Sequence, residues 1–190
     1  MKDLIEVRWH GRGGQGAVTV SKMLAESAMG EGYHVQAFPE YGAERMGAPV
    51  QAFTRISKEP IIIHSHVENP QIVLVLDPSL IGSIDILEGL DPKGIIITNS
   101  TQAPAEIRKT LNVGERKVFT VDANTISLEE LGRIIPNTPL LGAFSKVSEL
   151  VSLENTEEAV KKQLSKKFPT SVVEANIKAL RRGYEEVKGE

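Results

Sequence analysis

The chain of 190 residues contains no cysteine. This absence excludes disulfide bonds, thiolate nucleophiles, cysteine-ligated zinc and iron–sulfur clusters held by this polypeptide. If the protein takes part in redox chemistry, the metal clusters must therefore lie on another chain.

Other absences narrow the class of protein further. No apolar run approaches the roughly 20 residues that span a bilayer, so we expect no membrane contact. The N-terminal segment 1–4 lacks the long apolar region of a secretory signal, which predicts a cytoplasmic location. The net charge of −3 argues against nucleic-acid binding, because that function needs a basic surface. The serine elbow of hydrolases and the P-loop of NTPases are also missing, so neither chemistry has support.

The composition that remains predicts one domain over residues 1–190. Hydrophobic residues make up 41% of the chain, and no linker divides it. Strand-like apolar runs alternate with helical segments, which predicts an α/β, Rossmann-like three-layer fold with a mostly parallel sheet. The expected strands are 4–9, 33–38, 50–56, 72–76, 94–98 and 118–121, with 61–63 as a candidate hairpin partner of 50–56.

The last third of the chain is expected to be helical. Ser127 and Glu130 have the spacing of a capping box, which predicts a helix that begins at 127. Further helices are expected over 140–151, 155–167 and 171–187, the last capped by Ser171. The final helix carries an apolar stripe that either packs onto the sheet or docks on a partner subunit: Val173, Ile177, Leu180, Tyr184 and Val187.

A glycine-rich turn joins the first expected strand to the first helix, 17–26. Gly11, Gly13 and Gly16 have the spacing of a dinucleotide-binding turn, in which the backbone approaches a phosphate at a helix N-terminus. Arg12 and Gln15 could contact a ligand or a neighbouring chain. The candidate binding residues are Gly11, Arg12, Gly13, Gly14, Gln15 and Gly16. A structural turn that binds nothing stays open as the alternative.

An NAD site fits this turn poorly. Such a site needs an acidic residue at the end of the second strand to hold the ribose hydroxyls. Here that strand ends in apolar residues and proline, and Glu40 follows only in the next loop. Asp77, at the end of a buried strand, is as consistent with a helix cap as with a ligand.

A second unusual segment is the long loop over residues 40–49. Loops at the carboxyl ends of parallel strands are where α/β proteins bind ligands, although a solvated connection is the alternative. The candidate ligand or interface residues are Tyr41, Gly42, Glu44, Arg45 and Gly47. His64 and His66 lack an acidic cluster nearby, so we expect no metal site, and no catalytic residue stands out.

Taken together, these segments resemble the gamma subunits of 2-oxoacid:ferredoxin oxidoreductases, the pyruvate enzymes above all. The resemblance covers most of the chain, and its segments are Gly11–Gly16, Tyr41–Gly47, Thr54–Ser57, Leu74–Pro78, Gly94–Asn99 and Asn137–Ala143. Ala43 and Met46 stand where many members have proline and glycine. These departures leave the choice of 2-oxoacid open.

The resemblance implies a subunit that works with alpha, beta and delta chains and with ferredoxin as electron acceptor. Thiamine diphosphate, magnesium and iron–sulfur clusters would then belong to the partners, and the isolated chain would be inactive. Coenzyme A becomes the expected ligand of Gly11–Gly16, because it carries a pyrophosphate and a 3′-phosphate. Three alternatives stay open: the same subunit of an enzyme for another 2-oxoacid, a non-catalytic assembly subunit, and a nucleotide-dependent oxidoreductase that acts alone.

Overall fold

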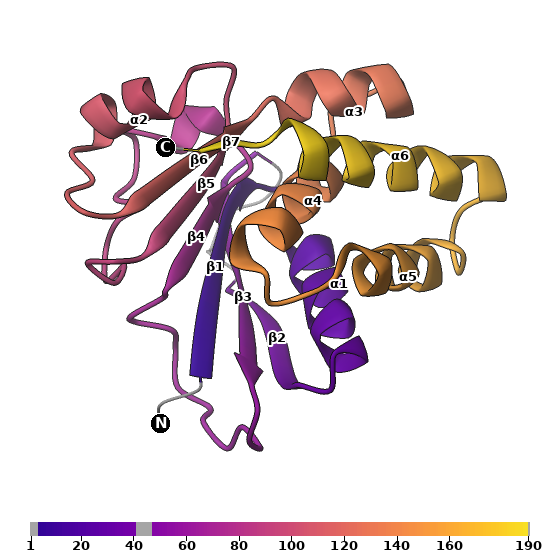
Figure 1. The fold of residues 1–190 in the computed structure, drawn as a ribbon, viewed down its shortest axis with the longest axis horizontal. Helices are drawn as coiled ribbons and strands as arrows, with labels where there is room; N and C mark the ends of the chain where they lie inside the picture. The colour runs from indigo at the N-terminus through magenta and orange to yellow at the C-terminus, as the bar shows by residue number, and fades with distance from the viewer. Residues whose placement is uncertain (1–3, 41–46, 190) are drawn as a thin grey trace.

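A seven-stranded sheet forms the middle layer of the computed structural model, which describes residues 4–40 and 47–189 (Figure 1). The strands lie in the order β2-β3-β1-β4-β5-β6-β7. Their bounds are β1 Leu4–Arg12, β2 His34–Glu40, β3 Pro49–Ser57, β4 Ile72–Val75, β5 Ile95–Asn99, β6 Lys117–Val121 and β7 Lys188–Gly189. β1, β4, β5 and β6 pair in parallel, and β2 runs in the same direction, which confirms the mostly parallel α/β fold.

The two faces of the sheet are covered unequally. The helices are α1 Ala17–Gly30, α2 Pro104–Leu111, α3 Ala123–Leu131, α4 Asn137–Ser148, α5 Leu153–Leu164 and α6 Thr170–Glu186, with a 3₁₀ turn η1 Pro78–Leu80. α1, α4, α5 and α6 gather on one side of the sheet, whereas α2 lies on the other (Figure 1). Two separate hydrophobic cores follow from this division.

The central strands are built from residues that suit burial on both faces. Val73, Val75, Ile96 and Ile97 have no exposed surface. Nearly continuous β-branched side chains are typical of a parallel strand between two layers, as expected for β4 and β5. Because β1 and β4 are parallel neighbours, their carboxyl ends lie at the same edge of the sheet, where the glycine turn also lies.

β3 departs from the doubly wound arrangement. It runs antiparallel between β1 and β2 and pairs with both, so the second strand is not the neighbour of the first. Two strand spacings, roughly 9 to 10 Å, separate the end of β2 from β1. The expected hairpin with 61–63 is wrong: these residues form no strand, and Ile62 is 80% exposed.

Two helix starts differ from the expectation. α3 begins at Ala123, where the Asp122 carboxylate accepts a hydrogen bond from Thr125 N at 3.0 Å. Ser127 is therefore inside the helix and fully buried rather than a cap. α6 begins after Pro169, so Ser171 does not cap it either. In both places a residue closer to the preceding loop takes the cap position.

α6, which carries the stripe, packs mainly on this chain's own helices α3, α4 and α5. Val173, Ile177 and Leu180 lie in the same core as α1 and α4. α4 and α6 come so close that a Cβ at Gly183 would overlap the carbonyl oxygen of Pro139. A Cβ at Gly142 would likewise overlap the carbonyl oxygen of Leu180.

We therefore expect Gly183→Ala to lower the free energy of unfolding by about 1–2 kcal/mol. Overpacking against backbone costs about 1–3 kcal/mol and cannot be relieved by a rotamer change, so it exceeds the gain in helix propensity of about 1 kcal/mol. Denaturant unfolding of the two proteins measures the difference. Lys178→Ala, on the exposed side of α6, is the control and should change stability by less than about 0.5 kcal/mol. A more stable Gly183→Ala variant would contradict the packing argument.

Candidate functional site

The glycine turn begins later than its spacing predicts, because β1 continues through Arg12. Gly11 and Arg12 pair with Val50 and Pro49 in the sheet. Gly14 and Gly16 then take φ angles of 97° and 84°, in the left-handed region that glycine adopts without strain. α1 starts directly after Gly16, and no side chain caps it, so its first backbone N–H groups have no partner within the helix.

The Gln15 side chain holds the turn in shape. Its Oε1 accepts a hydrogen bond from Arg12 N at 2.7 Å, and its Nε2 donates to Asp77 Oδ2 at 2.6 Å. The turn is thereby tied to the end of β4, where Asp77 also caps η1 through Ser79 N. Burial alone would raise the pKa of Asp77, but bonds from Ser79 and Gln15 and the charge of Arg12 together hold it below its usual range.

Arg12 is held on the same side of the turn. Its Nε and Nη2 donate to Ser79 Oγ at 3.1 and 2.9 Å, and its Nη1 donates to Gly47 O at 3.0 Å. Arg12 Nε also lies 3.4 Å from Asp77 Oδ2. The Arg12 guanidinium therefore holds together β1, η1 and the segment before β3.

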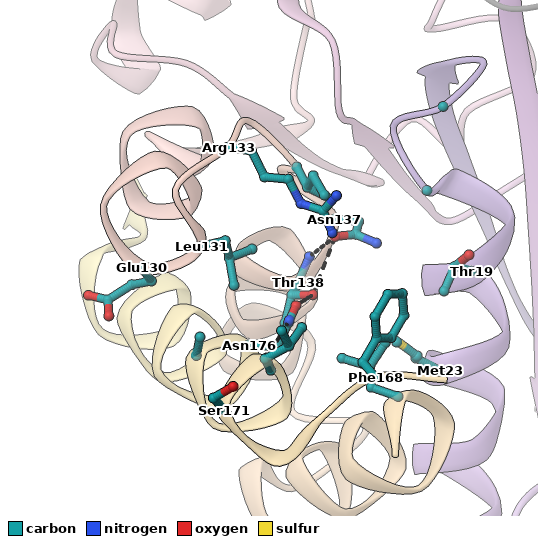
Figure 2. Close-up of a pocket in the computed structure, with 16 residues that line it drawn as sticks. Thr19, Met23, Glu130, Leu131, Arg133, Asn137, Thr138, Phe168, Ser171 and Asn176 are labelled. Atoms are coloured by element: carbon teal, nitrogen blue, oxygen red, sulfur yellow. Dashed lines mark hydrogen bonds between the residues drawn. The ribbon is translucent and has the colours of Figure 1, made fainter. Parts of the chain in front are cut away.

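The opposite side of the turn opens on a cavity of about 540 Å³ (Figure 2). Gly14 and Gly16 line it, whereas Arg12 and Gln15 do not. The N-terminal ends of α1, α4 and α6 reach it through Thr19, Thr138 and Ser171. Three helix N-termini therefore direct the positive ends of their dipoles toward one space.

Asn137 connects the cavity with the glycine turn. This side chain is 7% exposed, and its Oδ1 accepts from Thr138 N at 2.8 Å. Its Nδ2 lies against Gly16, where any Cβ would collide with it. Within residues 4–40 and 47–189 this amide nitrogen has no hydrogen-bond acceptor. It is an unused donor at the wall of the cavity.

The floor of the cavity is a polar link between α4 and α6. Thr138 Oγ1 donates to Asn176 Oδ1 at 3.0 Å, and Asn176 Nδ2 donates to Val172 O at 2.8 Å. Apolar side chains complete the walls: Met23, Leu131, Ile135, Leu164, Phe168, Val172 and Ala175. The cavity thus combines hydrogen-bond donors with an apolar surface.

The structure groups the predicted residues only in part. Gly47 lies beside the turn and accepts from Arg12, while Tyr41, Gly42, Glu44 and Arg45 lie outside the described residues. Asn137, Thr138 and Arg133 line the cavity although no motif had marked them as site residues. The signal available for Asn137 and Thr138 was the segment Asn137–Ala143 of the family resemblance, although the helix was expected to begin only at residue 140.

Other charged and titratable groups carry less chemistry. In the described part of the chain, no three histidine, aspartate or glutamate side chains are placed to hold a metal ion. His66 Nδ1 lies 4.0 Å from Glu40 Oε1, and both side chains are largely exposed.

Among the helices that the structure describes, none is long and apolar enough to cross a membrane.

His10 was not expected to have a special environment, but it is 1% exposed, near the carboxyl end of β1. Neither ring nitrogen has a hydrogen-bond partner within the described ranges. Burial, assisted by the charge of Arg8, lowers the pKa of His10 from 6.5 to about 3. The imidazole is therefore neutral in the folded protein.

The fold and the site define a class: a Rossmann-like α/β domain with a braced glycine turn beside a cavity lined by helix N-termini. Residues 6–186 match the family model described as pyruvate ferredoxin/flavodoxin oxidoreductase, and the chain belongs to this family. The resemblance seen in the sequence motifs is thereby confirmed.

Individual relatives agree with this assignment. The chain is 51% identical to the pyruvate synthase subunit PorC of Thermotoga maritima, over 98% of this chain and 96% of that protein. The crystal structure of the T. maritima pyruvate oxidoreductase subunit PORC matches with a TM-score of 0.86 and covers 99% of both chains, at 47% identity. The gamma subunit common to the pyruvate and ketoisovalerate oxidoreductases of Pyrococcus furiosus is 48% identical, over 97% of this chain and 98% of that one.

The buried state of His10 predicts a specific acid sensitivity. Between pH values of about 6.5 and about 3, the unfolded chain binds a proton at this imidazole that the folded chain does not bind. The free energy of unfolding therefore falls as the pH drops through this range, by about 1.4 kcal/mol per pH unit at most. In His10→Leu this contribution should disappear, which chemical denaturation at several pH values measures. The exposed His34, replaced by leucine, is the matched control, and equal effects in both variants would contradict a role of burial.

Proposed function

We propose that the chain is the gamma subunit of a multi-subunit pyruvate:ferredoxin oxidoreductase. This enzyme converts pyruvate, coenzyme A and oxidised ferredoxin into acetyl-CoA, carbon dioxide and reduced ferredoxin. The observation that carries the proposal is the 51% identity, over nearly the whole of both chains, to a pyruvate synthase subunit. The absence of cysteine supports it, because such a chain leaves the iron–sulfur clusters to its partners.

The proposed partners are alpha, beta and delta subunits, with ferredoxin as the electron acceptor of the assembled enzyme in the cytoplasm. These partners would hold thiamine diphosphate, magnesium and the clusters. Tyr41, Gly42, Glu44, Arg45 and Gly47 are proposed as a ligand or interface loop. Its anchor, Gly47, is bonded to Arg12 beside the glycine turn, which supports this placement.

Within that enzyme, we propose that the segment Gly11–Gly16 contributes to coenzyme A binding through its backbone. Gly14 and Gly16 face the cavity, and the first N–H groups of α1 follow them. Such groups suit a phosphate. Arg12 and Gln15 support the binding indirectly, because their side chains hold the turn against Asp77 and Ser79.

A second candidate function has one observation in its favour. The P. furiosus relative is named as a gamma subunit common to pyruvate and ketoisovalerate oxidoreductases. A chain shared between two enzymes would leave the choice of 2-oxoacid to the other subunits. The two candidates differ in how many sets of partners assemble with this chain.

Affinity purification of the tagged chain from its own cells tests the proposal. We expect alpha, beta and delta subunits to co-purify, and the complex to reduce ferredoxin when given pyruvate and coenzyme A. The isolated chain should show no turnover. Two sets of partners, one active on a branched-chain 2-oxoacid, would favour the shared subunit. Acetyl-CoA formation by the isolated chain, or a complex without pyruvate activity, would refute the pyruvate assignment.

Arg12→Ala tests the braced turn. We expect it to raise the KM for coenzyme A about tenfold in the assembled enzyme, because loss of the three side-chain hydrogen bonds to Ser79 and Gly47 loosens the turn. The kcat at saturating coenzyme A should stay near that of the wild type. Steady-state kinetics measures both constants, with Lys58→Ala at an exposed site as control. A normal KM with normal assembly would exclude a part of this turn in coenzyme A binding.

A further inference from the structure

The two margins of the sheet differ in the length of their edge strands. β7, at one margin, has two residues, whereas β2, at the other, has seven (Figure 1). β2 pairs with β3, and no other backbone hydrogen bond reaches it from the part of the chain that the structure describes. Native sheets keep such edges short or place lysine on them, because an open edge is a template for a further strand. β2 is long and carries no lysine.

The register of the sheet determines which backbone groups of β2 point outward. Leu76 N donates to His10 O, and Gln71 N donates to an even-numbered residue of β1 in the same way, so the even-numbered residues of β1 face β4. Its odd-numbered residues therefore face β3, because successive residues of a strand bond on opposite sides. The pairing continues one to one through β3 to β2. It leaves three residues of β2 with outward backbone groups: Val35, Ala37 and Pro39.

These three residues offer two donors and three acceptors, because proline has no N–H group. An antiparallel pair of two β2 strands centred on Ala37 uses all of the donors. The two Ala37 residues exchange both of their bonds, and Val35 N–H of each strand meets the carbonyl oxygen of Pro39 on the other. A proline whose nitrogen faces outward is typical of an edge strand, and here it removes one bond at each end of the pair.

The same register makes the ends of the strand complementary. His34 and Glu40 are the first and last residues of β2, and both are exposed. Each lies three residues from Ala37, so His34 of one copy stands opposite Glu40 of the other at both ends of the pair. A basic residue opposite a carboxylate is a favourable cross-strand pair. A pairing centred on Gln36 would also use both donors, but it would place His34 opposite Phe38.

Two apolar side chains lie beside this edge in exposed positions. Met29, at the end of α1 that leads into β2, is 61% exposed. Ile62 is 80% exposed, in the segment that Gln36 holds by donating to Ile61 O at 3.3 Å. They are the most exposed large apolar side chains of the described residues. Apolar groups beside an open edge favour a protein partner there.

We propose that β2 pairs with β2 of a second copy of this chain, antiparallel and centred on Ala37, so that the two sheets form one. The inference does not depend on which 2-oxoacid the enzyme uses. In the multi-subunit enzyme proposed above, this contact joins two copies of the complete assembly.

The absence of cysteine allows a direct test of the register. A single thiol introduced into the full-length chain can form a disulfide only with a thiol on another chain. His34→Cys and Glu40→Cys are oxidised alone and as an equal mixture. The mixture should give a disulfide-linked dimer on a non-reducing gel, because opposite residues of a non-hydrogen-bonded pair lie within disulfide distance. Each variant alone should stay unlinked, because its two equivalent thiols are about six residues, roughly 20 Å, apart.

Lys109→Cys is the control for random collision, because Lys109 is exposed on α2. It should link with neither of the two β2 variants.

An exchange of charges tests the same pair without a covalent bond. Glu40→Lys places a cation opposite His34, and His34→Glu places two carboxylates opposite each other. We expect each change to raise the dissociation constant of the dimer about tenfold, because both symmetry-related pairs are lost. The double variant His34→Glu/Glu40→Lys restores opposite charges and should return the constant to near that of the wild type. Sedimentation equilibrium measures the constants, and thermal unfolding checks that each variant is folded.

A wild-type chain that sediments as a monomer would overturn the inference. A mixture that links no better than the single variants, or no better than the Lys109→Cys control, would do the same. Linking of the His34→Cys variant to a different subunit in the assembled complex would assign the edge to that subunit instead of a second copy.

Discussion

The hydrogen bonds of the Gln15 amide are the constraint on which the site depends. One amide satisfies the backbone of Arg12 and reaches the carboxylate of Asp77, so the end of β1, the glycine turn and the end of β4 form one unit. This unit determines where α1 begins and which side of Gly14 and Gly16 remains open. A glycine turn has little stiffness of its own, because glycine has many allowed conformations. The rigidity comes from the side chain between the glycines.

The position of β3 gives a physical reason for the misfit with an NAD site. In a dinucleotide-binding fold, the acid that holds the ribose stands on the strand next to the first one. Here β3 occupies that place and runs the other way, so Glu40 at the end of β2 is displaced by one further strand. The missing acid is therefore a result of topology and not of a single substitution. The likeness to the P. furiosus and T. maritima chains extends over this region.

Local sequence patterns predicted most helices and strands. They failed where the start or the pairing of an element depends on residues distant in the sequence. The runs around Val73 and Ile96 predicted β4 and β5, because full burial selects β-branched residues. The capping box predicted at Ser127 does not form the helix start, because Asp122 caps α3 about one turn earlier. The place of β3 between β1 and β2 had no local signal, and the hairpin partner expected for it was wrong. Gly16 of the cavity belongs to the predicted spacing motif and Gly14 to the same turn, whereas Arg133 and Asn137 join them only in the folded chain.

Two glycines, Gly142 on α4 and Gly183 on α6, determine the width of the cavity although neither lines it. Gly142 and Gly183 let the backbones of these helices touch, and Thr138 and Asn176 at the nearby helix starts form one wall of the cavity. A side chain at either glycine would force the helices apart and widen the cavity without altering any residue that lines it. The volume of the cavity therefore depends on the contact between α4 and α6, whose glycines do not line the cavity. Changes there could alter which ligands fit while every contact residue stays the same.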